Sequence, residues 1–334
     1  MLPNDGRAAE GLLETRTVDD VSDEPAVTVV IPTLNAGPLL EEVLESISGQ
    51  EAPFPIEILV IDSESTDGTV ELVARRGIRC VSIPQLTFNH GATRNDAALL
   101  HCETPLVAFL SQDATPIGRH WLRDLAQPMK DPVVAGCFAT QRPRPDAHPF
   151  QRINAARHHS SPREDDTMSC ITAGAFDALK PEDRLRRLAF DNVSSIVRRD
   201  VLQKHPFPTC NFGEDMKWAR DVLLDGHSIV RSGKSEVLHS HAVDRVEFRD
   251  RSRQTHQLWR ELTDYSPFPH LGWWIRRTVG QICRLMAAAL RDGSRSVPRR
   301  VAIAATAPYW GWIQMWANRR GSNDGSYDPP RASA

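Results

Sequence analysis

The amino-acid sequence predicts an α/β fold with a mostly parallel central sheet flanked by helices. Two apolar runs, at residues 27–31 and 56–61, enclose a segment whose apolar residues recur at intervals of three and four. Strand, helix and strand in this order are typical of a βαβ unit in a parallel sheet. A third apolar run, at 106–110, predicts a further strand.

The remaining elements follow from the same periodicities. Residues 141–170 carry little periodicity, and a loop of that length is usually functional or mobile. Pro308 is expected to kink or end a helix near the C-terminus. We expect helices at 70–74, 91–100, 121–129, 201–204, 215–224, 247–262 and 271–290, and strands at 80–83, 133–140, 190–197, 228–231 and 237–239.

Composition narrows the class of protein. The 334 residues, 40% hydrophobic and 25% charged, are typical of a globular chain with one large domain and an appendage. A net charge of −3 provides no global basic field, so we expect no nucleic-acid partner. The six scattered cysteines predict free, mostly buried thiols and a cytoplasmic protein. We expect neither a signal peptide nor a transmembrane helix, because the chain has no suitable apolar run.

Polar residues follow the first two predicted strands. Thr33 and Asn35 come after the first strand, and Asp62, Ser63 and Ser65 come after the second. Ligands of open α/β sheets bind at the carboxyl ends of the strands, so these residues are candidate ligand contacts. The alternative is that they only cap helices and form turns. No G-x-G-x-x-G follows the first strand, which removes the main support for a dinucleotide-binding site.

Several stretches carry a resemblance to a known family. VVIPTLNAG and VIDSESTDGT closely resemble the start of a family 2 inverting glycosyltransferase with the Rossmann-like GT-A fold. FNHGATRN, SQDA and RPRPDAHP together resemble bacterial rhamnosyltransferases of that family, which take part in cell-surface polysaccharide synthesis. The resemblance runs from about residue 27 to 243. It implies a catalytic domain at 25–245, with its donor half at about 25–115 and its acceptor half at about 116–245. From the composition and periodicity of the flanking segments we expect disordered tails at 1–24 and 321–334 and a helical region at 246–320.

The resemblance also implies an activity and a donor site. The enzyme would be a hexosyltransferase that uses dTDP-β-L-rhamnose, with a glycan or a lipid-pyrophosphate-linked acceptor at the inner face of the cell membrane. Asp62 would accept a hydrogen bond from the base, since a carboxylate accepts and an imide N–H donates. Arg94 would fork two phosphate oxygens, and Gly91 would permit close backbone approach. The residues carried over to the nucleotide-sugar site are Pro32, Thr33, Asn35, Asp62, Ser63, Asn89, His90, Arg94, Gln112 and Asp113.

A divalent metal, Mg²⁺ or Mn²⁺, is expected to neutralise the donor diphosphate. Enzymes of this fold usually supply a D-x-D motif, but the chain reads Ser111-Gln112-Asp113 and lacks the first Asp. His239 and His241 alternate in LHSHA, which places both imidazoles on one face of a strand. The predicted metal ligands are therefore Asp113 with one or both of these histidines. The alternative for Asp113 is a turn or helix cap.

An inverting transfer needs one base to take the proton from the acceptor hydroxyl. Asp215 is the predicted base and Glu214 its helper, because the family's acidic pair occupies this place. Acidic residues in a first helical turn also stabilise the helix dipole, and that alone would account for both. Asp191, Asn192 and Trp218 are weaker candidates for the acceptor side.

Rival functions remain open at this point. Another family 2 transferase would use a UDP- or GDP-sugar, and an inactive nucleotide-binding scaffold would agree with the missing Asp. A nucleotidyltransferase would need a Gly-rich phosphate loop with a Lys near the first strand, where the chain has Asn35-Ala36-Gly37-Pro38.

The C-terminal region has a stripe of apolar residues interspersed with arginines. Such a stripe either lies in a membrane interface or packs on the catalytic domain or on a second subunit as a homodimer. We expect packing, because apolar stripes are usually core. The stripe consists of Leu271, Trp274, Ile275, Val279, Ile282, Met286 and Leu290.

Overall fold

The computed structural model describes residues 26–148, 150–152, 166–171, 174–240, 245–268, 270–293 and 295–323. The predictions for residues 1–24, for 153–165, for His241 and for 324–334 lie outside this part of the chain. In the first half the elements are β1 Val27–Thr33, α1 Gly37–Ser48, β2 Ile56–Asp62, α2 Thr69–Arg75, β3 Arg79–Ser82, α3 His90–Leu100, β4 Leu106–Leu110, β5 Thr115–Pro116 and α4 Trp121–Ala126. They continue with β6 Val134–Arg142, β7 Thr167–Cys170, α6 Pro181–Arg187, β8 Ser194–Arg198, α7 Arg199–Lys204, α8 Glu214–Leu224, β9 Ser228–Leu238, α9 Arg245–Thr263, α10 Leu271–Arg291 and α11 Val297–Asn323.

The described strands form one sheet in the order β3-β2-β1-β4-β8-β6-β9-β5, with β7 paired to β9. β1 runs parallel to β2 and β4, and β2 runs parallel to β3, so the predicted βαβ unit is confirmed. In this register Thr33 pairs with Asp62, and both strands end at the same edge of the sheet.

Beyond β4 the sheet is mixed, and this brings distant segments to that same edge. β8 is antiparallel to β4 and pairs Ser194 with Leu110, so the residues before β8 meet the loop after β4. β6 is antiparallel to β8, and β9 is parallel to β6 with Leu238 beside Arg142. The ends of β1, β2, β4, β6 and β9 and the start of β8 therefore line one edge.

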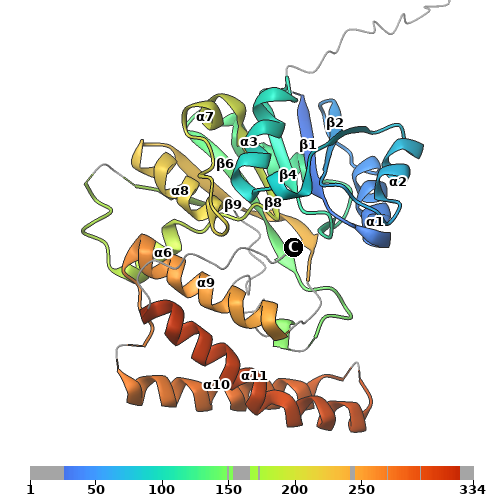
Figure 1. Cartoon of the computed structure of the whole chain (residues 1–334). Helices are drawn as coiled ribbons and strands as arrows, with labels where there is room; N and C mark the ends of the chain where they lie inside the picture. The colour runs from blue at the N-terminus through green and yellow to red at the C-terminus, as the bar shows by residue number, and fades with distance from the viewer. Residues whose placement is uncertain are drawn as a thin grey trace, which may run out of the picture.

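Helices cover both faces of the sheet (Figure 1). α1, α2 and α4 pack on one face, and α3, α7 and α8 pack on the other. β1 alternates between the two, since Val29 and Ile31 join the first core and Val30 the second. Each such side chain stabilises the fold by about 1.5–3 kcal/mol when fully buried. The two-sided burial explains why β1 reads as a continuous apolar run.

Three details differ from the sequence predictions. β9 is one strand where two short ones were predicted, and its polar middle forms an irregularity opposite β6. α11 continues through Pro308, so of the two predicted effects, a kink or a helix end, the helix end is wrong. Within the described residues all six cysteines are free, but Cys170 and Cys283 are exposed rather than buried.

The three C-terminal helices lie together below the sheet in Figure 1, with α9 nearest to it and α10 and α11 beyond. α9 joins the sheet core through Leu258 and Leu262. α10 and α11 pack side by side, with the Trp274 Nε1–H donating to the Met315 carbonyl at 2.8 Å. Among the described helices, none has both the length and the apolar character needed to cross a membrane.

Most of the α10 stripe does not pack on the rest of this chain, so the prediction that it packs on the catalytic domain is wrong, while packing on a second subunit stays a prediction. The buried residues of α10 are Trp274, Thr278, Gln281, Leu285 and Ala289. Polar members of this set are satisfied, because Thr278 Oγ1 donates to the Trp274 carbonyl within α10 and Gln281 Nε2 donates to Gln314 Oε1 on α11. Most of the predicted stripe is exposed instead: Leu271, Ile275, Val279, Met286 and Leu290.

Candidate active site

The loops after β1 and β2 are held together by a buried carboxylate. Asp62, which is 1% exposed, accepts from Thr33 Oγ1 at 2.9 Å, from the Ser65 hydroxyl at 2.5 Å and from the Ser65 backbone N–H at 2.9 Å. Asn35 has a left-handed backbone with φ 46°, and its N–H donates to Ser65 Oγ at 2.8 Å. Asp62 thus orders both strand-end loops.

The nearby predicted contacts are placed as follows. Pro32 is half-buried one residue before the end of β1. The Ser63 hydroxyl is buried and has no hydrogen-bond partner among the described residues. Such an atom is costly unless a ligand or water satisfies it. Gln112 connects two loops, because its side chain accepts from the Leu34 N–H at 2.8 Å and donates to the Leu34 carbonyl at 3.1 Å.

Asp113 and His239 meet at the sheet edge, with His239 Nε2 3.4 Å from Asp113 Oδ1. On its other side His239 Nδ1 lies 2.8 Å from Gln141 Oε1, and Gln141 Nε2 donates to Asp191. Because the Asp191 carboxylate only accepts, the Gln141 amide nitrogen must face it, and Oε1 must face the histidine. His239 therefore carries its proton on Nδ1 when neutral, which leaves the Nε2 lone pair facing a carboxylate.

The oxygen and nitrogen donors of Asp113 and His239 fit Mg²⁺ or Mn²⁺, with Gln141 as the outer partner that orients the imidazole. Among the described residues, no group of three His, Cys, Asp or Glu side chains is arranged to hold a metal. His241, the third predicted ligand, lies outside the described residues.

The predicted catalytic pair opens α8, but its two members are held differently. Glu214, 6% exposed, accepts from Arg94 Nη1 at 3.2 Å and from Asn192 Nδ2 at 3.4 Å. Asp215 is half-buried and accepts from the Met216 N–H at 2.7 Å and from the Asn192 N–H at 3.4 Å. Glu214 is thus a buried ion-pair partner, and Asp215 is the more accessible carboxylate.

The pKa of Asp215 is raised well above its usual value. The main cause is loss of solvation, and the negative charges of Glu214 and Asp191 add to it. A carboxyl group with a raised pKa is a stronger base once ionised, so it is better suited to take a proton from a hydroxyl near neutral pH.

Three predicted donor contacts in the FNHGATRN stretch have structural roles instead. Arg94 is 6% exposed and bonds to Glu214 and the His90 carbonyl, so it does not present a free fork to phosphates. Asn89 caps α3 through Oδ1 and donates to the Cys210 carbonyl at 3.1 Å. A Cβ on Gly91 would lie 2.2 Å from the Pro208 carbonyl oxygen, so the close approach is to that backbone. The His90 side chain is exposed beside Phe88.

The three weaker candidates for the acceptor side differ in how far they are buried and in what they contact. Asp191 is half-buried in the Gln141 contact, at the edge of the site. Asn192 is 2% exposed and connects Glu214 with Asp215. Trp218 has no exposed surface and donates to the His205 carbonyl at 2.8 Å, so it belongs to the core and cannot touch an acceptor.

Sequence reasoning missed three residues that build the site. Gln141 orients His239, and Arg144 bonds to the Asp113 carbonyl at 3.4 Å and to Thr115 Oγ1 at 2.5 Å. Arg144 lies in the RPRPDAHP stretch and Gln141 directly precedes it, so this stretch was the sequence feature that could have pointed to both residues. Leu258 of α9 packs where a Cβ on Gly213 would be, 2.2 Å from Leu258 Cδ2, so α9 supports the start of α8.

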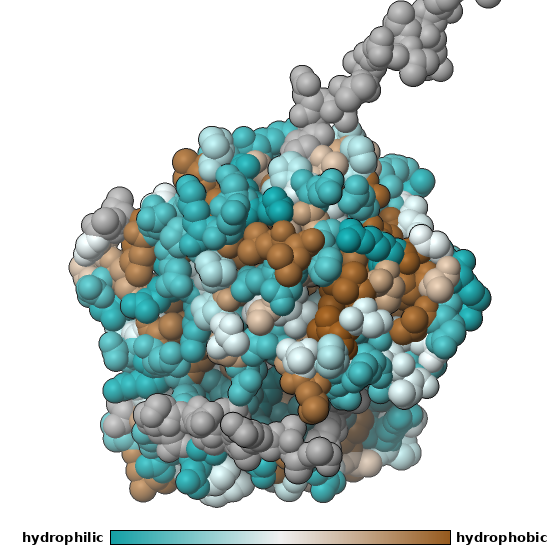
Figure 2. Space-filling view, turned by 45° about the horizontal axis from the view of Figure 1, so that its top comes forward, coloured by the Kyte–Doolittle hydropathy of each residue, from teal (hydrophilic) through white to brown (hydrophobic). Residues whose placement is uncertain are grey.

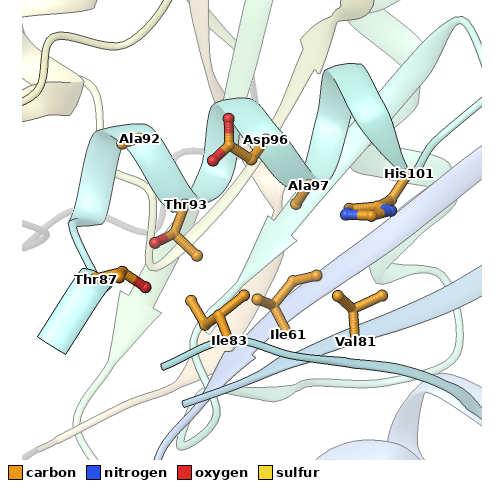
Figure 3. A pocket seen from close by; sticks show the side chains of 9 residues that line it. All are labelled: Ile61, Val81, Ile83, Thr87, Ala92, Thr93, Asp96, Ala97 and His101. Carbon is orange, nitrogen blue, oxygen red and sulfur yellow. The ribbon is translucent and has the colours of Figure 1, made fainter. Parts of the chain in front are cut away.

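A separate small pocket of about 100 Å³ lies between α3 and the ends of β2 and β3 (Figure 3). Ile61, Val81 and Ile83 point from the sheet towards α3, and Thr93 and Asp96 line the helix side. None of the residues predicted for the site lines this pocket. The better candidate is the group of charged residues at the ends of the strands, which we call the strand-end cluster. It lies where α/β sheets bind ligands, and its members are Asp62, Asp113, Asp191, Glu214, Asp215 and His239.

Comparison with known proteins bears on this arrangement. The family described as Glycosyl transferase family 2 matches residues 28–203. The O-antigen chain rhamnosyltransferase RfbN of Salmonella typhimurium is 28% identical over 289 residues, 85% of this chain and 83% of that protein. The O-antigen chain rhamnosyltransferase WbaN of Salmonella anatum is 26% identical over 294 residues, 86% and 84% of the two chains.

A solved structure bears on the fold alone. The mannosyltransferase PcManGT of Pyrobaculum calidifontis, in complex with GDP-Man and Mn²⁺, matches with a TM-score of 0.56 and 22% identity. The match covers 90% of this chain and 86% of that one. The predicted GT-A fold is thereby confirmed.

Proposed function

Because this chain belongs to glycosyl transferase family 2, we propose that it is an inverting transferase of L-rhamnose. The donor would be dTDP-β-L-rhamnose, and the acceptor a glycan or a lipid-pyrophosphate-linked glycan of the cell surface. Similarity to two O-antigen chain rhamnosyltransferases along more than four fifths of the chain supports this donor. The transferase activity itself rests on the family and on the strand-end cluster.

The observation that carries the mechanism is the half-buried Asp215 carboxylate with its raised pKa. The acceptor hydroxyl oxygen would attack the anomeric carbon of the donor, and Asp215 would take the hydroxyl proton. The bond from that carbon to the diphosphate oxygen breaks with inversion, and its electron pair leaves with the nucleotide diphosphate. Glu214 stays paired with Arg94 and, through Asn192, orients Asp215.

The leaving diphosphate would be received at Asp113 and His239. A divalent cation bound by these residues would supply charge neutralisation to the diphosphate. Gln141 holds the imidazole so that Nε2 faces Asp113, and Arg144 holds the backbone of the Asp113 loop. The loops ordered by Asp62, together with the buried Ser63 hydroxyl, would bind the nucleoside.

The test is donor hydrolysis and thermal stabilisation across a panel of dTDP-, UDP- and GDP-sugars, each with Mn²⁺, Mg²⁺ or EDTA. The proposal predicts selective hydrolysis of dTDP-β-L-rhamnose that is lost in Asp113→Ala. Selective use of a UDP- or GDP-sugar would keep the transferase and overturn the rhamnose assignment. Nucleotide binding without turnover of any donor would favour an inactive scaffold.

A further inference from the structure

The outer side of α10 and α11 presents a set of exposed apolar residues. Val279 is 55% exposed, Val301 54% and Trp312 52%, which is unusual for side chains of this type in well-packed helices. We refer to the set as the hairpin face. Its members are Leu271, Ile275, Val279, Met286 and Leu290 of α10 and Val297, Val301, Tyr309, Trp312 and Trp316 of α11.

The two halves of the hairpin face adjoin one another. Within each helix the members recur mainly at intervals of three or four residues, so each half lies along one side of its helix. The Trp312 ring packs edge-on against Trp274 at 5.2 Å between centroids. A Cβ on the neighbouring Gly311 would lie 2.5 Å from Ile282 Cγ1, so α11 rests directly against the α10 stripe.

The interior side of the hairpin is already filled. Leu285, Ala307 and Trp310 are buried together with Phe150. A Cβ on Gly321 of α11 would lie 2.1 Å from the Arg253 carbonyl oxygen, so α11 and α9 pack closely. The residues of the hairpin face are therefore not needed to fill the interior of the hairpin. Figure 2 shows another part of the surface, where hydrophobic groups are interspersed among hydrophilic residues.

The charge of the hairpin differs from that of the rest of the chain. Residues 271–323 contain nine arginines and one acidic residue, Asp292, whereas the whole chain has a net charge of −3. Asp292 is already paired with Arg295 at 3.1 Å. Arg320 lies over the Trp316 ring at 5.1 Å, and Arg276 lies over Trp273 at 5.5 Å, so cations lie among the apolar side chains.

We propose that the hairpin face docks on the headgroup layer of a membrane that contains anionic phospholipid. Exposed apolar side chains, aromatic rings and arginines are the composition of interfacial helices, and anionic lipids attract such basic segments. A second copy fits less well, because two hairpins of the same high positive charge would repel each other. The helices would lie on the surface, since none described is suited to cross it. The inference does not depend on the sugar donor.

The test is flotation of the full chain with phosphatidylcholine vesicles, with and without about one quarter phosphatidylglycerol. We expect at least about fivefold more bound protein with the anionic lipid at 0.1 M salt, and a marked loss at 0.5 M salt, because salt screens the attraction. The double variant Val279→Asp/Val301→Asp should bind at least about tenfold less. The matched control is Leu100→Asp, which changes a 72% exposed leucine at the end of α3 and should bind like the wild type.

A charge-reversal variant separates lipid attraction from general stickiness. Arg291→Glu/Arg299→Glu changes two exposed arginines and should remove the preference for phosphatidylglycerol. Circular dichroism and thermal unfolding establish that each variant is folded. Equal vesicle binding by wild type and Val279→Asp/Val301→Asp would overturn the proposal. So would a dimer in sedimentation velocity that this double variant abolishes while the wild type binds no vesicles, since that would assign the face to a second copy.

Discussion

The strand-end site and the hairpin face depart from the usual distribution of side chains in opposite ways. The site buries charge, with Asp62, Arg94 and Glu214 each at most 6% exposed. The hairpin exposes apolar side chains on α10 while it buries Thr278 and Gln281. Buried charge costs stability unless hydrogen bonds and ion pairs offset it, whereas exposed apolar side chains only forgo the stabilisation that burial would give. The difference teaches that the charges of the site are stabilised from within by its own hydrogen bonds, whereas nothing in the described part of the chain covers the hairpin face, for which we propose a membrane.

The largest expected effect is at Asp215. Asp215→Asn removes the proposed base and should lower sugar transfer by about 10²- to 10⁴-fold, the range typical of general-base loss. The folded protein should be as stable as the wild type or more stable at pH 7, because the substitution removes a carboxylate whose ionisation is opposed by Glu214 and Asp191. Transfer rates and thermal unfolding measured on the same preparations check both. A destabilised but fully active variant would contradict the account.

The buried ion pair should be the most sensitive structural feature of the site. Arg94→Met leaves Glu214 buried without its 3.2 Å partner and should lower the free energy of unfolding by about 3–5 kcal/mol. The double variant Arg94→Met/Glu214→Gln, measured by urea unfolding, should recover much of this loss. An equal loss in the double variant would show that the effect is not the uncompensated charge.

The contact between α9 and the start of α8 should have an intermediate effect. Gly213 has φ 78°, and a Cβ there would lie 2.2 Å from Leu258 Cδ2. Gly213→Ala should destabilise the fold by about 1–3 kcal/mol through backbone strain and overpacking. Leu258→Ala in the same chain should relieve the overpacking but not the strain. The reference for this double variant is Leu258→Ala alone, because truncating a buried leucine has a cost of its own. Equal stability of these two variants would mean that the positive φ contributes nothing.

The smallest effect is expected on the hairpin face, where a matched pair of substitutions lies on one helix. Val279→Ala, at a side chain 55% exposed, should change the unfolding free energy by no more than about 0.5 kcal/mol. Leu285→Ala, at a side chain 1% exposed, should cost about 2–5 kcal/mol. Similar losses at both positions, measured by urea unfolding, would show that the hairpin face is packed in solution.

The features that the sequence could predict are those whose interacting residues lie close together along the chain. The βαβ unit was predictable because hydrophobic periodicity is a local property of the sequence. The strand-end loop after β2 is also local, since Asp62 bonds to Ser65 only three residues away. The pairing of Arg94 with Glu214 spans 120 residues, so the sequence could not show that Arg94 is already paired. Gln141 was missed for the same reason, since it contacts His239 98 residues away.

The hairpin shows a different limit. The periodicity correctly identified residues that share one side of α10. It could not show which side of α10 faces α11, because that depends on the partner helix. Thr278 can be buried because it donates to the Trp274 carbonyl of its own helix, and Gln281 because it donates to Gln314 of α11. The apolar side next to them was left exposed.

The most direct test of the central claim is the pH dependence of sugar transfer by the wild type and by Asp215→Asn, with dTDP-β-L-rhamnose and a rhamnose-accepting glycan. The pKa of Asp215 is raised, mainly by loss of solvation, so the wild-type rate should fall as the pH drops through a value above about 4. Stability should change in the opposite sense, falling as pH rises from about 4 through the folded-state pKa, because the folded state disfavours the ionised carboxylate. The account predicts a much slower variant that lacks this limb. A variant with the wild-type rate and the same pH profile would show that Asp215 is not the base.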